Sequence, residues 1–216
     1  MIRNHFYRLN ILALLYFSPA TLFFRINALP WYAGTLQVWL DALGYRSGDA
    51  ILEVGCATGQ LTRYLARHGA VVHGVDNSPK MLRKANASAT EGASFVLASA
   101  TDLPFENHRF DYIVAASLIN IISEPETALR EMARVCKPGG KVSVLVPQKG
   151  MADVETLADH LNLSGFSRAA LMAWHRHAPK MEPRKLLEYF GNAGLQAKHV
   201  ETHLSGMVMT VTGIRL

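Results

Sequence analysis

The chain has 216 residues, of which 50% are hydrophobic and 18% charged, and its formal net charge is +5. This composition excludes a disordered or collagen-like chain and is typical of one globular domain, and the scattered Lys and Arg residues form no run that would mark a nucleic-acid surface. The cysteines, Cys56 and Cys136, form no CxxC pair, which excludes a disulfide scaffold or a thiolate zinc site and favours a reducing, cytoplasmic location.

Residues 1–46 are predicted to form helices that cap the domain. Three arginines precede the first acidic residue, Asp41, and the apolar run Ile11–Phe17 is too short for a spanning helix, which needs about 20 residues. Two other interpretations remain open. One is a cleaved signal peptide with its exit at residues 18–20. The other is peripheral contact with a membrane surface through residues 1–30, because arginine and aromatic residues beside an apolar face suit a lipid interface.

From residue 50 onward, apolar segments alternate with amphipathic ones. The apolar segments predict strands at 50–54, 71–75, 94–98, 110–116 and 141–147, and the segments between them predict helices that include 59–67 and 79–88. Strands that alternate with helices indicate an α/β fold whose parallel sheet is covered on both faces.

The helix before the fifth of these strands has start and stop signals of its own. Ser123 and Glu126 have the spacing of a capping box, and Gly139 with Gly140 is predicted to end the helix.

The last third of the chain departs from the alternation. Residues 148–182 form an insertion with its own helical period, and a further helix follows. The tail then predicts two strands joined at Ser205 and Gly206, an antiparallel hairpin. The whole is a doubly wound, Rossmann-like sheet of seven strands, mostly parallel, with helices on both faces. The prediction is one domain over 1–216, in four parts: 1–46, 48–147, 148–182 and 183–216.

The segment "ILEVGCATGQLT", residues 51–62, raises the question of what its glycine turn holds. A dinucleotide fingerprint that starts at Gly55 would need glycine at Ala57 and Gln60 as well, and no GxxxxGK[ST] phosphate loop is present. Glu53 lies two residues before the turn, and the turn contains no Lys or Arg. A carboxylate at this place disfavours a pyrophosphate and favours a cationic ligand.

Asp76 ends the second predicted strand, in "VHGVDNS". A carboxylate there is placed to accept hydrogen bonds from the hydroxyl groups of a ribose. Ser78 is the better N-cap for the helix that follows, which leaves Asp76 for a ligand.

Four segments together resemble a known family. "ILEVGCATGQLT", "VHGVDNSPKML", "ASATDLPFENHRFDYIVAA" and "ALREMARVCKPGGKVSVLVP" look like the successive motifs of class I S-adenosylmethionine-dependent methyltransferases. The nearest subgroup is the small-molecule branch that includes the ubiquinone and menaquinone biosynthesis enzymes. The resemblance covers residues 48–147 and the final hairpin, which matches the family's reversed seventh strand.

The resemblance implies S-adenosylmethionine as the cofactor and assigns roles around it. Asp76 would bind the ribose, Ser117 would face the sulfonium, and the other positions would surround the methionine part (Glu53, Gly55, Gly59) and the adenosine part (Asn77, Met81, Ser99, Ala100). Three positions depart from the family pattern. Ala57 and Ser99 stand where glycine and aspartate are common, with Asp102 as a substitute acceptor for the adenine, and Asn120 stands where histidine is frequent.

Residues 148–182 lie where this fold often inserts a substrate lid. The sequence shows no unambiguous base, and His175 and His177 of the lid are the best placed by topology, with solvated surface as the alternative role. Trp174 is a candidate wall of the acceptor pocket, and Tyr32 a candidate cover over the cofactor's carboxylate; both residues could instead only pack. No HxxxH pair or carboxylate cluster suggests a metal site.

The predicted acceptor is small and largely apolar: a quinone-like or phenol-like molecule, a thiol or a lipid. Nucleic acid is disfavoured, because the segment after the fourth strand lacks the proline-containing loop of those methyltransferases. A module that binds the cofactor without turnover is the remaining alternative, supported by Ser99 and Asn120.

Overall fold

The structure is a computed structural model that describes residues 2–88, 90–150 and 153–216. Its strands are β1 (Ala50–Val54), β2 (Val71–Asp76), β3 (Ala93–Leu97), β4 (Phe110–Ala116), β5 (Cys136–Pro147), β6 (Leu195–His203) and β7 (Val208–Arg215). Its helices are α1 (Ile2–Phe17), α2 (Pro19–Asn27), α3 (Pro30–Asp41), α4 (Gln60–Arg67), α5 (Pro79–Asn86), α6 (Pro125–Val135), α7 (Val154–His160), α8 (Gly165–His177) and α9 (Pro183–Asn192).

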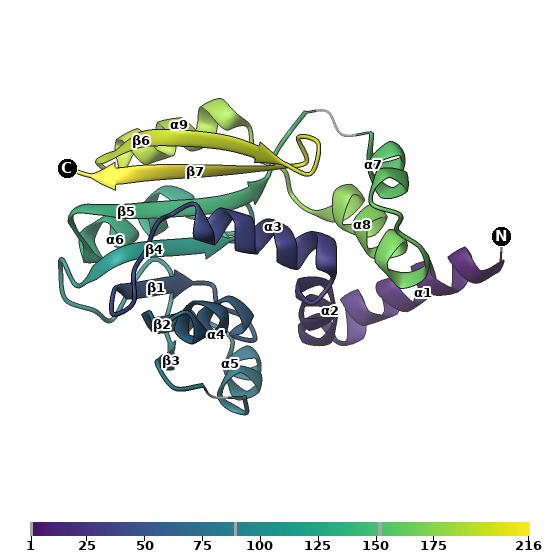
Figure 1. Ribbon diagram of the computed structural model, residues 1–216, viewed down its shortest axis with the longest axis horizontal. Coiled ribbons are helices and arrows are strands. Elements are labelled where there is room, and N and C mark those ends of the chain that lie inside the picture. Colours follow the sequence, from purple (N-terminus) through teal and green to yellow (C-terminus); the bar gives the residue numbers. More distant parts are fainter. Residues whose placement is uncertain (1, 89, 151–152) are drawn as a thin grey trace.

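The seven strands form one sheet in the order β3-β2-β1-β4-β5-β7-β6 (Figure 1). All neighbours are parallel except at β7, which runs antiparallel to both β5 and β6. The predicted α/β class, doubly wound sheet and reversed last strand are therefore confirmed.

Successive residues of each strand point to opposite sides of the sheet. Because apolar side chains lie on both sides, helices cover both faces. In β1, Ile51 packs into the core beneath α3 and α4, whereas Leu52 packs into the core beneath α6 and α9. The two layers are visible in front of and behind the sheet in Figure 1.

The amino-terminal helices and the insertion after β5 come together at one end of the molecule. The helix α1 packs against α2 and α8, and α3 continues onto the sheet (Figure 1). Trp31 and Tyr32 of α3 meet Trp174 of α8, with ring centroids 5.9 and 5.6 Å from that of Trp174. Among the described residues, no helix is both long and apolar enough to cross a membrane.

The predicted limits of α6 are wrong at both ends. Its N-cap is Glu124 with no side-chain capping bond, and Glu126 instead lies 3.8 Å from Arg130 in an exposed i,i+4 ion pair. Residues 136–140 extend β5 rather than the helix, because Cys136 turns to extended geometry and pairs with Phe110 of β4. Strand pairing, a long-range contact, outweighs the local helix signals here.

Candidate functional site

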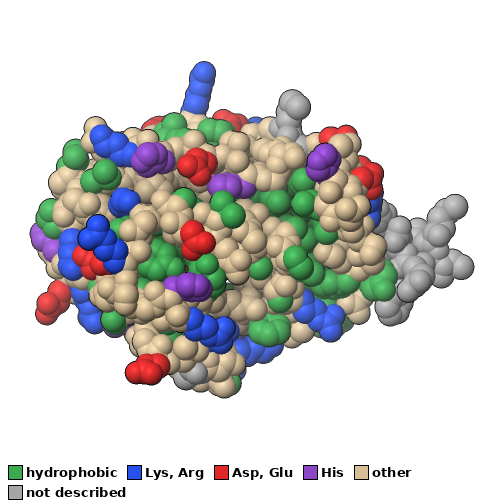
Figure 2. Space-filling model, in the orientation of Figure 1, with side chains coloured by type: hydrophobic (Ala, Val, Ile, Leu, Met, Phe, Trp, Pro, Cys, Tyr) green, Lys and Arg blue, Asp and Glu red, His purple; other side chains and the backbone are tan. Residues whose placement is uncertain are grey.

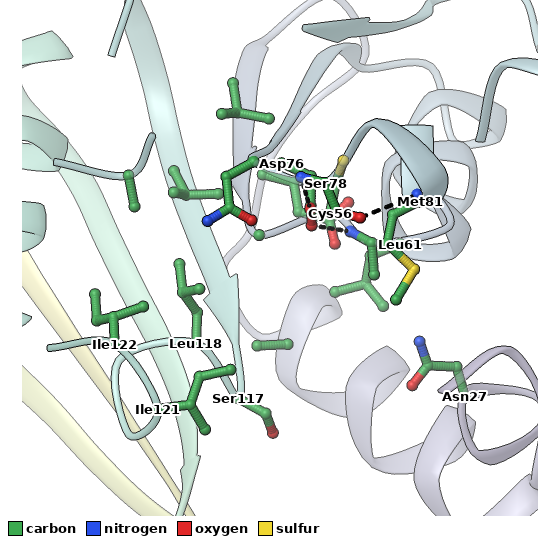
Figure 3. Close-up of a pocket in the computed structure, with 18 of the residues that line it drawn as sticks. Asn27, Cys56, Leu61, Asp76, Ser78, Met81, Ser117, Leu118, Ile121 and Ile122 are labelled. Atoms are coloured by element: carbon green, nitrogen blue, oxygen red, sulfur yellow. Dashed lines mark hydrogen bonds between the residues drawn. The ribbon is translucent and has the colours of Figure 1, made fainter. Parts of the chain in front are cut away.

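A cavity of about 600 Å³ opens at the carboxyl ends of β1, β2 and β4. The strand order reverses direction between β1 and β4, and ligands of doubly wound sheets bind at such a switch point. Figure 3 shows Asp76, Ser78 and Met81 on one side of the cavity and Leu118, Ile121 and Ile122 on the opposite side. The side with Asp76 and Ser78 is therefore mixed polar and apolar, whereas the opposite side presents a group of apolar side chains.

A side chain is excluded at each of the two glycines of the turn by a different neighbour. Both have left-handed backbones, with φ of 79° at Gly55 and 74° at Gly59. Gly55 lines the cavity, and a Cβ there would lie 3.0 Å from the Leu118 side chain. Gly59 is not part of the wall, and its Cβ would lie 2.5 Å from the Phe95 ring. Gly59 thus serves the packing of the turn, while Gly55 leaves room beside the cavity.

Asp76 lies in the wall but is not fully free for a ligand. Its Oδ2 accepts a hydrogen bond from the Ala57 amide at 2.8 Å, and its Oδ1 accepts one from the Ser78 amide at 2.9 Å. Ser78 is the N-cap of α5, as expected, since its hydroxyl accepts from the Met81 amide. Each carboxylate oxygen keeps a second lone pair, so Asp76 can hold the turn and still accept from a ligand.

Glu53 reaches the cavity from the end of β1 and is 4% exposed. Burial raises the pKa of its carboxyl from 4.5 to about 7, although a hydrogen bond from the Thr62 hydroxyl group opposes the rise. A nearby cation would favour the ionised form of this carboxyl.

The charges around the cavity have one sign. Glu53, Asp76 and Glu124 contribute carboxyl groups, and no Lys, Arg or His lies among the described residues of the wall. The wall therefore suits a ligand that carries positive charge, as the glycine turn predicts.

The two residues that are candidates for contact with the substrate, Tyr32 and Trp174, also line the cavity. Tyr32 is buried, and its hydroxyl shares a hydrogen bond of 3.2 Å with the Ser117 hydroxyl. Burial raises the pKa of the Tyr32 phenol above its usual value of 10.0. Ser117 follows β4 with φ of 52°, a conformation that non-glycine residues seldom adopt and that clusters at functional sites. Trp174 lines the cavity from α8.

The structure brings most of the predicted cofactor residues together. In addition to those described above, Asn77, Met81, Ser99 and Ala100 line the cavity. The Ser99 hydroxyl is engaged with Thr101 at 2.8 Å, and Asp102, the suggested substitute, is not in the wall.

The structure does not bring the predicted bases to the cavity. His175 is half-buried and His177 is exposed, and neither is part of the wall. Asn120 turns away from it, donating to the Pro179 carbonyl at 2.9 Å. Among the described residues, no group of three His, Cys, Asp or Glu could hold a metal ion.

Sequence reasoning missed several residues of the wall, among them Asn27, Gln60, Ile121 and Glu124. Gln60 is the first residue of α4, and its Oε1 is buried without a protein partner, so it can accept a hydrogen bond from a ligand amine. The position of Gln60 could have been inferred, because it begins the helix after the glycine turn. Asn27 comes from α2, whose position depends on tertiary packing that periodicity does not predict.

Part of the chain is similar to known proteins. Residues 52–144 match the family model described as "Methyltransferase domain". The chain is 38% identical over 104 residues to demethylmenaquinone methyltransferase of Tropheryma whipplei, covering 47% of this chain and 43% of that protein. It is 39% identical over 103 residues to phosphatidylethanolamine N-methyltransferase of Cereibacter sphaeroides, covering 45% and 50%. The chain thus matches about half the length of these curated relatives.

Solved structures share the fold. A S-adenosylmethionine-dependent methyltransferase from Mesorhizobium loti has a TM-score of 0.65 and 18% identity, covering 88% of this chain and all of that one. One from Aquifex aeolicus has a TM-score of 0.66 and 18% identity, covering 84% and 89%. At these identities the likeness is one of architecture.

Proposed function

We propose that this chain, whose residues 52–144 match a methyltransferase family model, is a class I S-adenosylmethionine-dependent methyltransferase that transfers a methyl group to a small, largely apolar acceptor. One observation carries the proposal. The cavity at the switch point is lined by three carboxyl groups (Glu53, Asp76, Glu124) and by a group of apolar side chains (Leu118, Ile121, Ile122), with no cationic side chain in its described wall. The carboxyl groups suit a cationic donor, and the apolar side chains suit an apolar acceptor.

The residues present fit the cofactor of the family. S-adenosylmethionine, when bound, supplies a methyl group activated by a sulfonium cation. Glu53 and the backbone at Gly55 would hold the methionine part, with Gln60 Oε1 accepting from its amino group. Asp76 would accept from the ribose hydroxyls, with the adenosine neighbours as assigned from the family pattern (Asn77, Met81, Ser99, Ala100).

We infer that the chain contributes mainly positioning and dehydration. Tyr32 and Trp174 line the cavity from two elements that are distant in sequence and contact each other, so together they would limit the access of water to the reacting groups. Because α8 supplies Trp174, this arrangement supports a lid function for residues 148–182.

The apolar side indicates the acceptor class. Leu118, Ile121 and Ile122 would leave a highly charged acceptor without partners, at a cost in desolvation. The two named relatives act, by their names, on a quinone precursor and a phospholipid. We infer that the acceptor of this protein is likewise lipid-soluble, with a quinol or a phospholipid amine as the leading classes.

The first test is calorimetry with S-adenosylhomocysteine and NAD. Binding of S-adenosylhomocysteine without NAD is the expected result, and the reverse pattern would refute the proposal. A methyl-transfer screen across quinols, phenols, thiols, phosphatidylethanolamine and RNA then identifies the acceptor. Cofactor binding with no transfer to any of these would favour the binding module without turnover.

A further inference from the structure

The helix α1 is apolar on two opposite sides. Its inner side, with Tyr7, Ile11 and Leu14, packs into the core next to α8. Its outer side presents Leu9 and Tyr16, which are 65% and 82% exposed. A helix of a globular protein usually has a polar outer side, so an apolar one indicates a second contact.

Exposed apolar side chains lie on both α1 and α2. We call them the α1–α2 apolar surface: Leu9, Leu12, Leu15, Tyr16, Phe17 and Phe24. The rings of Tyr16 and Phe17 contact each other with centroids 4.9 Å apart. Leucine, phenylalanine and tyrosine are the side chains that enter the boundary between lipid headgroups and acyl chains.

The charges beside this surface are positive. Arg25 is exposed on α2, and no acidic residue precedes Asp41 in the chain. The exposed helix α5 carries Lys80, Arg83 and Lys84, and Lys84 Nζ donates to the Thr21 hydroxyl of α2 at 3.3 Å. Figure 2 shows Lys and Arg beside hydrophobic side chains along the lower edge of this face, where Figure 1 places α2.

We propose that the α1–α2 apolar surface docks on the surface of an anionic lipid bilayer. Anionic headgroups complement the flanking cations, and the leucine and aromatic side chains enter the boundary beneath them. A second copy of the chain fits less well, because a symmetric contact would bring the same cations together without a carboxylate from residues 1–40 to pair with them.

The same helices connect the surface to the cavity. Ile26 and Asn27, at the end of α2, line the cavity that the proposed function assigns to cofactor and acceptor. Docking would therefore place a helix that lines the cavity at the bilayer, where a lipid-soluble acceptor is dissolved. The membrane contact itself does not depend on which reaction the cavity performs.

The test is co-sedimentation with vesicles of phosphatidylcholine alone or of phosphatidylcholine mixed with the anionic lipid phosphatidylglycerol. We expect binding to the anionic vesicles that weakens with added salt. The variant Leu9→Ser/Leu12→Ser/Tyr16→Ser should lose more than about tenfold in vesicle affinity. The matched control Val38→Ser/Val200→Ser, which removes exposed apolar side chains elsewhere, should bind as the wild type does.

A second measurement needs no loss of function. Tyr16→Trp should show a blue-shifted emission on anionic vesicles and quenching by brominated lipid, beyond the signal of the native tryptophans. Calorimetry with S-adenosylhomocysteine reports separately on the folded cavity. Absence of quenching in Tyr16→Trp, or equal vesicle binding by the triple variant, would overturn the proposal. So would dimerisation of the wild type that the triple variant abolishes, because it would assign the surface to a second copy.

Discussion

The hydroxyl of Tyr32 lies 3.2 Å from the hydroxyl of Ser117, and this pair links α3 to the end of β4 inside the cavity wall. The two residues are 85 positions apart in the chain. Tyr32 belongs to the helices that precede the sheet, and Ser117 directly follows strand β4, so the pair couples the amino-terminal segment to the cofactor-binding core.

Removing this link should weaken cofactor binding. We expect Tyr32→Phe to lower the affinity for S-adenosylhomocysteine by roughly 2- to 10-fold, or about 0.5–1.4 kcal/mol, because the hydroxyls no longer hold the wall. Calorimetry on Tyr32→Phe, Ser117→Ala and the double variant gives the interaction free energy between the two side chains in cofactor binding. Tyr64→Phe, which removes an exposed bond to Asp41 outside the wall, is the matched control. Additive effects of the two changes would show that the pair is not a functional unit.

Asp76→Ala should affect both binding and stability. Loss of charge-assisted bonds to the ribose should weaken S-adenosylhomocysteine binding by roughly 10- to 150-fold, or about 1.5–3 kcal/mol. Loss of the bonds from Ala57 and Ser78 should also lower the free energy of unfolding by about 1–3 kcal/mol, measured with urea. Asp102→Ala, an exposed carboxylate outside the wall, should change neither quantity. An Asp76→Ala protein with wild-type affinity would mean that the ribose is held elsewhere.

Glu53→Gln should change how stability depends on pH. Burial raises the pKa of the Glu53 carboxyl from 4.5 to about 7, so the folded protein holds a proton that the unfolded chain releases. The contribution of this group to stability is therefore full below pH 4.5 and is lost as the pH rises to 7, by up to about 3 kcal/mol. Glutamine does not titrate. The free energy of unfolding of Glu53→Gln should thus fall less than that of the wild type between pH 4.5 and 7.

Glu53→Gln should also affect a cationic ligand more than a neutral one. At pH 8, removing the Glu53 carboxylate should weaken the binding of S-adenosylmethionine, a sulfonium cation, more than the binding of S-adenosylhomocysteine, a neutral thioether. The difference in the loss of binding free energy should be about 1 kcal/mol. Equal losses for the two ligands would remove Glu53 from the recognition of positive charge.

Gly59→Ala should destabilise the fold with little effect on the intact cavity. The new Cβ would meet the Phe95 ring at 2.5 Å on a left-handed backbone, which should cost about 2–4 kcal/mol in urea unfolding. Affinity of the folded fraction for S-adenosylhomocysteine should stay within about tenfold, or about 1.4 kcal/mol, because Gly59 is not in the wall. Gly34→Ala is the control: it lies within α3 with no heavy atom within 4 Å of the new Cβ, and it should raise stability by about 0.5–1 kcal/mol.

Ile121→Glu should separate the acceptor from the cofactor. A charge on the apolar side should reduce methyl transfer to an apolar acceptor by more than about tenfold, while S-adenosylhomocysteine affinity stays within about threefold. Demethylmenaquinol and phosphatidylethanolamine serve as test acceptors in a methyl-transfer assay. Val200→Glu, an exposed apolar position on β6, is the control. Undiminished transfer would place the acceptor away from Ile121.

The sheet could be predicted because its information is local. The period of apolar residues along each strand predicts the strands, and the turn at Ser205 and Gly206 predicts an antiparallel pair, whereas the reversal of the last strand within the sheet is implied by the family resemblance. The polar side of the cavity followed as well, since Glu53 and Asp76 stand at strand ends, where a parallel sheet gathers its ligand groups.

Other parts of the site depend on contacts between distant segments. The sequence predicts Asp76 as a ligand group but not its bonds to Ala57 and Ser78, which exist only once the turn folds back onto β2. The sequence predicts no role for Glu124, because the capping-box signal at Ser123 indicates a different helix start. The exclusion of His175 and His177 from the wall is set by how α8 packs on α1, which no local pattern encodes.

The position of β7 has a consequence for synthesis of the chain. This strand lies between β5 and β6 and pairs with both, so the sheet is completed by residues 208–215. Until those residues leave the ribosome, β5 presents an unpaired edge of buried valines and β6 has no partner, a state that favours aggregation. A nascent chain arrested before Val208 should therefore need a chaperone to remain in solution, whereas one extended past Arg215 should not.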